Sequence, residues 1–169
     1  MSRFPLPVPA RFSPANVQPT MVMAEKMLPI GQPQQRSAMQ TLILYAITTV
    51  IFLSLDAVML KLHMQPLFQR FLGDQLLTDI RIVPAALFYL AYVAGLVYLV
   101  SYPALKTGSA TLIPAAIIGA MAYGTYEFTS YAIMKSWSPI LVMNDLAWGT
   151  VLTALSAWAG VALTRAFTA

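Results

Sequence analysis

The sequence predicts an all-α, polytopic integral membrane protein in which four transmembrane helices form an antiparallel bundle. The 169 residues are 59% hydrophobic and only 9% charged, whereas a soluble globular domain carries about 25% charged residues. The apolar residues also come in four blocks of about 20 residues each, the length at which a helix crosses a bilayer. None of the blocks keeps the polar face that a helix of a soluble bundle presents to water. A soluble bundle is therefore disfavoured.

Residues 1–38 are expected to form a proline-rich extramembrane tail, separate from a transmembrane domain at 39–169. Prolines recur throughout the tail, and because each lacks an amide donor a continuous helix is excluded. The tail has no apolar stretch of signal-peptide length. By composition such a tail is disordered alone, and the alternative is that it becomes ordered along a partner protein. Its candidate partner-binding residues are Arg3, Phe4, Arg11 and Phe12.

The first expected span, at about 41–62, is followed by a segment at 64–81 that is too polar to cross a membrane. Apolar residues recur in this segment near helical spacing, with Pro66 near its start and Gly73 as an interruption. The pattern predicts a short helix lying in the membrane interface, and the alternative is an ordinary loop.

The remaining spans are expected at about 82–105, 110–134 and 140–163. The links "YPALKTGS" and "KSWSP" are short, so consecutive helices should be antiparallel neighbours. Small residues in the last two spans should let helix backbones approach each other closely. The helix-packing candidates are Gly119, Gly124, Gly149 and Gly160.

Three of the six acidic residues lie inside the expected spans: Asp56, Glu127 and Asp145. At a rise of about 1.5 Å per residue, Asp56 lies about 22 Å from the side that holds the termini, and Glu127 about 25 Å. Asp145 starts from the opposite side, five residues past Ile140, and in a core of about 30 Å it reaches the same depth. We therefore expect the three acids to meet inside the bundle.

A charge at the bilayer centre costs about 2.5–3.5 kcal/mol on insertion scales, so these acids should face the bundle interior and accept hydrogen bonds. Tyrosines, Tyr89 and Tyr92 among them, could supply hydroxyl donors. Intramembrane acids are candidates for a functional site, and the alternative is a structural polar network that fixes helix register. The predicted buried polar cluster consists of Asp56, Glu127, Asp145, Tyr123, Tyr126, Ser130 and Lys135.

The other charges bear on partners and orientation. The net charge of +4 is spread along the chain, which suits contact with membrane lipids better than nucleic-acid binding. The basic groups Lys61, His63 and Arg81, near helix ends, are expected to extend towards headgroups. Six Lys and Arg lie on the side of the termini and four on the other. This favours cytoplasmic termini, although the difference disappears when only residues near the spans are counted.

Two segments carry a resemblance to a known family. "YGTYEFTSYAIMKSW" and "NDLAWGT" resemble the pattern Y-G-T-Y-D-L-T-N-x-A-T-L-K-x-W followed by D-x-x-W-G-T of an uncharacterised family of small, predicted four-helix bacterial membrane proteins. The segments "LSLDAVML", "LFYLAYVAGLVY" and "YPAL" match in order, so the resemblance covers about residues 41–165. The chain departs from the pattern at Glu127, Ser130 and Met59, where the family has Asp, Asn and usually Trp. The resemblance implies a four-helix membrane fold in a bacterial inner membrane. The signature positions are Asp56, Tyr123, Gly124, Tyr126, Glu127, Thr129, Ser130, Lys135, Trp137, Asp145, Trp148 and Gly149.

Three functions remain open from the sequence. The first is an accessory or structural subunit of a larger membrane protein complex, with the tail ordered along a partner. The second is a proton-coupled transporter or carrier that uses the buried carboxylates, which would need an oligomer because one protomer is small for a pathway. The third is a lipid- or isoprenoid-modifying enzyme with a carboxyl as general acid. Catalysis is the less favoured reading, since no nucleophile motif, phosphate loop, cysteine or metal-ligand spacing is present. No cofactor is predicted, although a bound lipid or pigment would be compatible.

Overall fold

A computed structural model describes the backbone of residues 32–168 and the side chains of residues 35–168. The candidate partner-binding residues of the tail, Arg3, Phe4, Arg11 and Phe12, lie outside the described residues. The chain divides into two units between Gln35 and Arg36.

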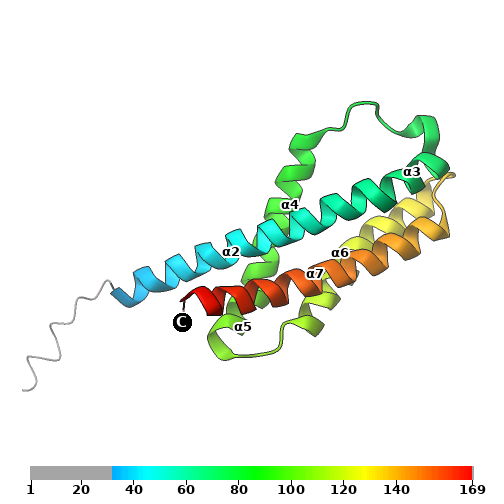
Figure 1. Ribbon diagram of the computed structural model, residues 1–169. Helices are drawn as coiled ribbons and strands as arrows, with labels where there is room; N and C mark the ends of the chain where they lie inside the picture. The colour runs from blue at the N-terminus through cyan, green and yellow to red at the C-terminus, as the bar shows by residue number, and fades with distance from the viewer. Residues whose placement is uncertain (1–31, 169) are drawn as a thin grey trace, which may run out of the picture. The chain divides into compact units, whose positions relative to one another are not determined.

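The described part of the chain is helical throughout and contains no strand (Figure 1). This confirms the predicted all-α class. The helices are α2 (Gln32–Met59), the π-helix η2 (Leu60–Met64), α3 (Gln65–Leu72), the 3-10 turn η3 (Gly73–Gln75), α4 (Ile82–Leu96), the π-helix η4 (Val97–Ser101), α5 (Tyr102–Thr107), α6 (Leu112–Ile133) and α7 (Pro139–Thr168).

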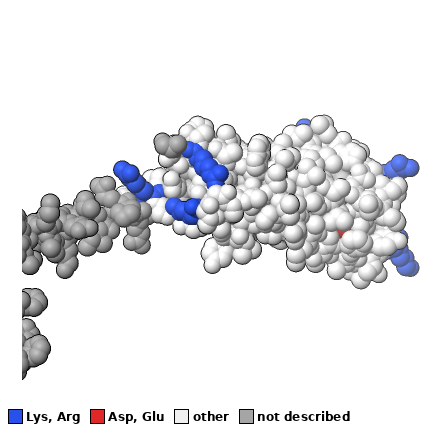
Figure 2. Space-filling model, turned by 90° about the horizontal axis from the view of Figure 1, so that it is seen from below, with Lys and Arg blue, Asp and Glu red and all other residues white. Residues whose placement is uncertain are grey.

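Among residues 32–168, three helices are long and apolar enough to cross a membrane, by length and composition: Gln35–Gln75, Ile82–Thr107 and Pro139–Thr168. Helix α6 has 22 residues but is not one of the three, because its second half carries Glu127 and a run of tyrosines, threonines and a serine. On the face seen in Figure 2, Lys and Arg gather at the two ends of the unit, and the surface between them is almost free of charge. Such a distribution is typical of a membrane protein.

The segment after the first expected span differs from both of its predicted forms. It is neither a separate interfacial helix nor a loop, because α2, η2, α3 and η3 run on as one helix from Gln35 to Gln75. Pro66 is the second residue after the π-helix η2, and Pro103 is the second residue after η4. A proline ring clashes with the carbonyl four residues earlier in an α-helix, and a wider π-turn can relieve that clash. Each proline is thus accommodated within a long helix.

For the same reason the predicted link "YPALKTGS" is shorter than expected. Tyr102–Thr107 is helical as α5, and the chain turns only at Gly108, whose φ of 77° lies in the left-handed region that glycine adopts readily.

Helices α6 and α7 pack against each other over much of their length. Two glycines make this close approach feasible. A Cβ atom added at Gly119 would lie 2.6 Å from the Gly149 carbonyl oxygen, and one added at Gly149 would overlap the Tyr123 ring. Gly160 of α7 is similarly covered by Thr48 of α2, whereas Gly124 has only ordinary contact with Leu146.

Helices α2 and α4 are held together by larger side chains. The Phe52 ring of α2 lies 5.9 Å from Tyr89 and 5.5 Å from Tyr92 of α4, and it belongs to a buried cluster that includes Leu152 of α7. At the other end of α2, Gln40 donates a hydrogen bond to Thr168 near the end of α7. The start of α2 and the end of α7 therefore lie on one side of the unit.

Candidate functional site

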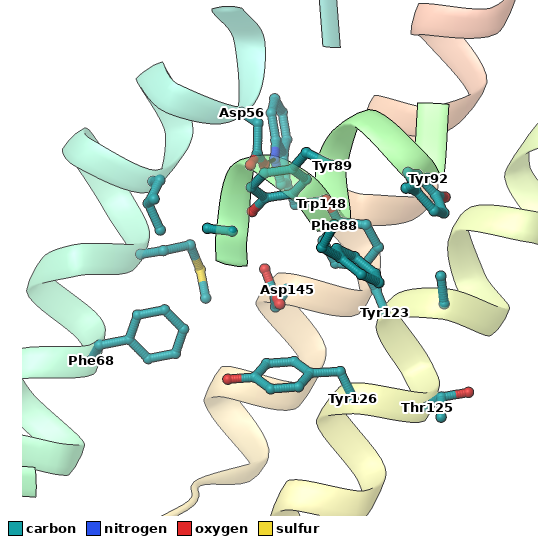
Figure 3. A pocket seen from close by; sticks show the side chains of 14 residues that line it. Asp56, Phe68, Phe88, Tyr89, Tyr92, Tyr123, Thr125, Tyr126, Asp145 and Trp148 are labelled. Atoms are coloured by element: carbon teal, nitrogen blue, oxygen red, sulfur yellow. Dashed lines mark hydrogen bonds between the residues drawn. The ribbon is translucent and has the colours of Figure 1, made fainter. Parts of the chain in front are cut away.

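A cavity of about 580 Å³ opens between α2, η2, α3, α4, α6 and α7 (Figure 3). This volume lies within the range of about 300–1,000 Å³ that is usual for small-molecule sites. Its lining combines two carboxylates with seven aromatic side chains and a few apolar residues. The lining residues are Asp56, Leu60, Met64, Phe68, Ala85, Phe88, Tyr89, Tyr92, Ala122, Tyr123, Thr125, Tyr126, Asp145 and Trp148.

The first carboxylate, Asp56, is contributed by α2 and is only 7% exposed. The Trp148 indole of α7 donates a hydrogen bond of 3.2 Å to its Oδ1 atom, and the Tyr89 hydroxyl of α4 lies beside it (Figure 3). A carboxylate inside an apolar bundle is tolerated when donors surround it. Three helices thus converge on Asp56.

The second carboxylate, Asp145, lies in the first turns of α7 and is half-buried. Figure 3 shows it between Asp56 and Tyr126, directed into the cavity. Glu127 of α6 and Asp56 lie close enough to act on it electrostatically. The structure thus brings together the three acids that the helical rise places at one depth.

Glu127 of α6 is fully buried but does not line the cavity. The Trp137 indole donates a hydrogen bond of 2.8 Å to its Oε2 atom. Its Oε1 atom has no hydrogen-bond partner among residues 35–168, and neither has the hydroxyl of Tyr123. Buried polar atoms without partners are rare in proteins.

The remaining members of the predicted cluster are placed differently from one another. Tyr123 and Tyr126 line the cavity, and Tyr126 is 52% exposed. Ser130 is buried but does not line the cavity. Lys135 departs from the prediction of a buried residue because its side chain is exposed. It follows the end of α6, where a long basic side chain can extend to water or headgroups.

Of the side chains that the structure describes, no basic one lines the cavity. Lys61 and Arg81 are exposed, and a ring nitrogen of His63 pairs with the Asn144 side-chain oxygen at 2.9 Å. Among residues 35–168, no group of three His, Asp or Glu side chains converges as a metal site would require. Chemically, the cavity is an apolar, aromatic chamber with an excess of carboxyl groups, suited to hold protons or a positively charged group.

Two aromatic residues that line the cavity were not among those predicted from the sequence. Phe88 of α4 shares a helix face with Ala85, Tyr89 and Tyr92, all of which line the cavity, and this spacing is a usable signal. Phe68 of α3 had no such signal, because its position depends on the long helix continuing past the π-turn.

Residues 41–162 match a family described as "Predicted membrane protein (DUF2177)". No curated protein and no solved structure matches the chain significantly.

Proposed function

The chain belongs to this family of predicted membrane proteins, and from that premise we propose that it is a proton-coupled carrier of small amphiphiles. The observation that carries the proposal is the cavity, in which Asp56 and Asp145 face an aromatic chamber that none of the described basic residues lines. In this proposal the carboxyl groups hold protons when the cavity is empty of substrate and release them when substrate binds. Intramembrane acids that face such a cavity commonly serve proton or ion pathways.

The cavity is accessible from the lipid side, which supports an amphiphilic substrate. Phe88 and Tyr126 line it and are 62% and 52% exposed. In a bilayer these rings would contact acyl chains, so a substrate dissolved in the membrane could enter between α4 and α6. A strongly hydrophilic substrate would find no polar route among these side chains.

The proposal includes four membrane crossings, with α6 as the third, in a bacterial inner membrane with both termini in the cytoplasm. In support, Tyr92 of α4 forms a hydrogen bond of 2.9 Å with Thr153 of α7, so these two long helices are in contact. Helix α6 packs along α7 and therefore joins the same core.

The number of crossings can be tested by cysteine labelling. The chain has no cysteine, so single cysteines can be introduced without removing native ones. Cysteines at Ser37 and Ser109 should react with a membrane-impermeant maleimide from the cytoplasmic side, and cysteines at Gln69 and Ser136 from the opposite side. Labelling of Ser109 and Ser136 from one side would exclude the crossing by α6.

Reconstituted vesicles test the carrier directly. With a pH gradient imposed and a pH-sensitive dye inside, a panel of cationic, neutral and anionic amphiphiles is added, and empty vesicles report spontaneous permeation. At least one class should dissipate the gradient through the wild-type protein. Asp56→Asn and Asp145→Asn should abolish that response, whereas Asp74→Asn, an exposed acid outside the cavity, should keep it. Wild-type rates in both cavity variants would refute the carrier.

The competing functions draw less support from the described residues. The accessory-subunit hypothesis depends on the tail at 1–38, which falls almost wholly outside the described residues. Its test is native-gel analysis of the protein purified in mild detergent with and without the tail, where a co-migrating partner must disappear on truncation. A lipid-modifying enzyme would use Asp145 as general acid in the same cavity, and a deletion strain would then show altered lipid or pigment composition.

A further inference from the structure

We infer that the ligand of the cavity is an organic cation: an ammonium group carried on an apolar or aromatic body. This inference rests on the proposed function, and it specifies the substrate class of the same site. It follows from two features of the lining taken together, the unpaired excess of acid and the arrangement of aromatic rings.

The acid excess favours a positively charged ligand. Asp56 and Asp145 both line the cavity, and none of the described basic side chains lines it with them. A ligand cation would be attracted to these carboxyl groups once they release their protons, and a chamber of low polarity strengthens that attraction. An anionic ligand would be repelled by the same carboxylates, and a neutral one would gain no such attraction.

The aromatic rings favour an organic cation over a metal ion. Seven aromatic side chains line the cavity, and Phe88 stacks on Tyr92 with ring centroids 6.1 Å apart. Ring faces attract ammonium groups, above all quaternary ones, through cation–π interactions. A metal ion instead requires several converging oxygen or nitrogen ligands, and no such group of acids or histidine occurs among residues 35–168.

The lining also indicates that the ligand has no phosphate group beside its ammonium. A zwitterionic phospholipid would bring a phosphate next to its ammonium group, and no lysine, arginine or histidine in the described part of the chain lines the cavity to receive it. We therefore assign the site to an amphiphile whose polar end is the ammonium alone.

Binding of a charge-matched pair of probes tests the inference. The full chain in phosphatidylglycerol nanodiscs is dialysed against radiolabelled phenylhexyltrimethylammonium, or against its neutral isostere in which carbon replaces the ammonium nitrogen. Empty nanodiscs correct for partitioning. The cation should bind saturably, at least about tenfold tighter than the isostere. Asp145→Asn should lose about tenfold in cation affinity, and Phe88→Leu about fivefold. Asp79→Asn, an exposed acid outside the cavity, should change nothing.

A further variant and a lipid competitor separate the alternative explanations of a binding result. Asp145→Glu should retain the preference for the cation, which a folding defect would not allow. Added phosphatidylcholine should not compete, and competition by it would overturn the assignment to an amphiphile whose polar end is the ammonium alone. Equal binding of the two probes, or full cation affinity in Asp145→Asn, would overturn the inference. Equal probe binding combined with acid-dependent transport would leave the carrier intact. A cation preference without acid-dependent transport would remove the carrier and keep the binding site.

Discussion

The indole of Trp148 and the carboxyl of Asp56 join α7 to α2 by a hydrogen bond of 3.2 Å at the wall of the cavity. The two residues are 92 positions apart in the sequence, so the bond forms only when the first and last long helices are correctly placed. It satisfies Asp56 at Oδ1, and it fixes one aromatic wall of the chamber beside one of its carboxylates. The ligand site and the helix arrangement therefore depend on the same contact.

Replacing Trp148 by Phe should destabilise the fold more than replacing another tryptophan of α7. Trp148→Phe removes the donor to Asp56, a residue only 7% exposed, and leaving a buried acceptor unsatisfied costs about 1–3 kcal/mol. Trp158→Phe, at a site 52% exposed, is the matched control. Thermal unfolding in detergent, followed by far-ultraviolet circular dichroism, measures both. Equal shifts in melting temperature would contradict the role assigned to the bond.

Two glycine-to-alanine substitutions should change stability in opposite directions. Gly149→Ala places a methyl group into the Tyr123 ring, and overpacking of this kind costs about 1–3 kcal/mol. Gly95→Ala, within α4, meets nothing within 4 Å and should stabilise the helix by about 0.5–1 kcal/mol. The same unfolding experiment measures the melting temperatures of both variants. Because the displaced Tyr123 ring lines the cavity, Gly149→Ala should also weaken ligand binding, and Gly95→Ala should not.

The hydroxyl and the ring of Tyr92 should be separable. The hydroxyl pairs with Thr153 of α7 at 2.9 Å, while the ring lines the cavity. Tyr92→Phe should therefore lower the free energy of unfolding by about 0.5–1.5 kcal/mol and leave cation affinity unchanged, since the ring face remains. Tyr92→Leu should lower both the free energy of unfolding and the affinity for the cation. Loss of binding in the Phe variant would mean that the hydroxyl, rather than the ring, contacts the ligand.

The sequence was sufficient to predict how deep each acid lies in the bundle, but not which way each side chain points. Hydropathy located the last three long helices to within about five residues, whereas the first continues to Gln75 instead of ending near residue 62. The constant rise of a helix put Asp56, Glu127 and Asp145 at one level, where the structure has them as neighbours. The rotation of each helix about its axis is set by packing with the others. For that reason Lys135 was expected in the cluster although it is exposed.

The second limit of the sequence-based prediction was whether a helix continues past a proline. Pro66 and the polar residues around it predicted a break after the first span, because a proline in a helix removes one hydrogen bond and crowds the preceding turn. The π-turn at Leu60–Met64 absorbs the proline instead, and α3 continues the helix so that Phe68 reaches the cavity. Whether a proline ends a helix or is carried through it depends on tertiary contacts, which local sequence does not contain.

The buried pair of Trp137 and Glu127 gives the sharpest test of whether the acids are built into the fold. Trp137→Phe leaves a fully buried carboxyl without its donor at 2.8 Å. The penalty for an unsatisfied buried group is about 1–3 kcal/mol, and more when the group is charged. The indole also packs against Tyr126 and Phe68, at 5.5 Å and 6.0 Å between ring centroids, so the single variant loses packing as well.

A double-mutant cycle with Glu127→Met separates the two losses. Because the packing loss is present whether or not Glu127 remains, only the hydrogen bond contributes to the coupling energy. Replacing both partners by apolar groups of similar size is close to neutral, so the double variant should be more stable than Trp137→Phe alone. Thermal unfolding of the four proteins measures the cycle. Additive losses would mean that Glu127 does not depend on the indole, and the three acids would then owe their proximity to helix packing alone.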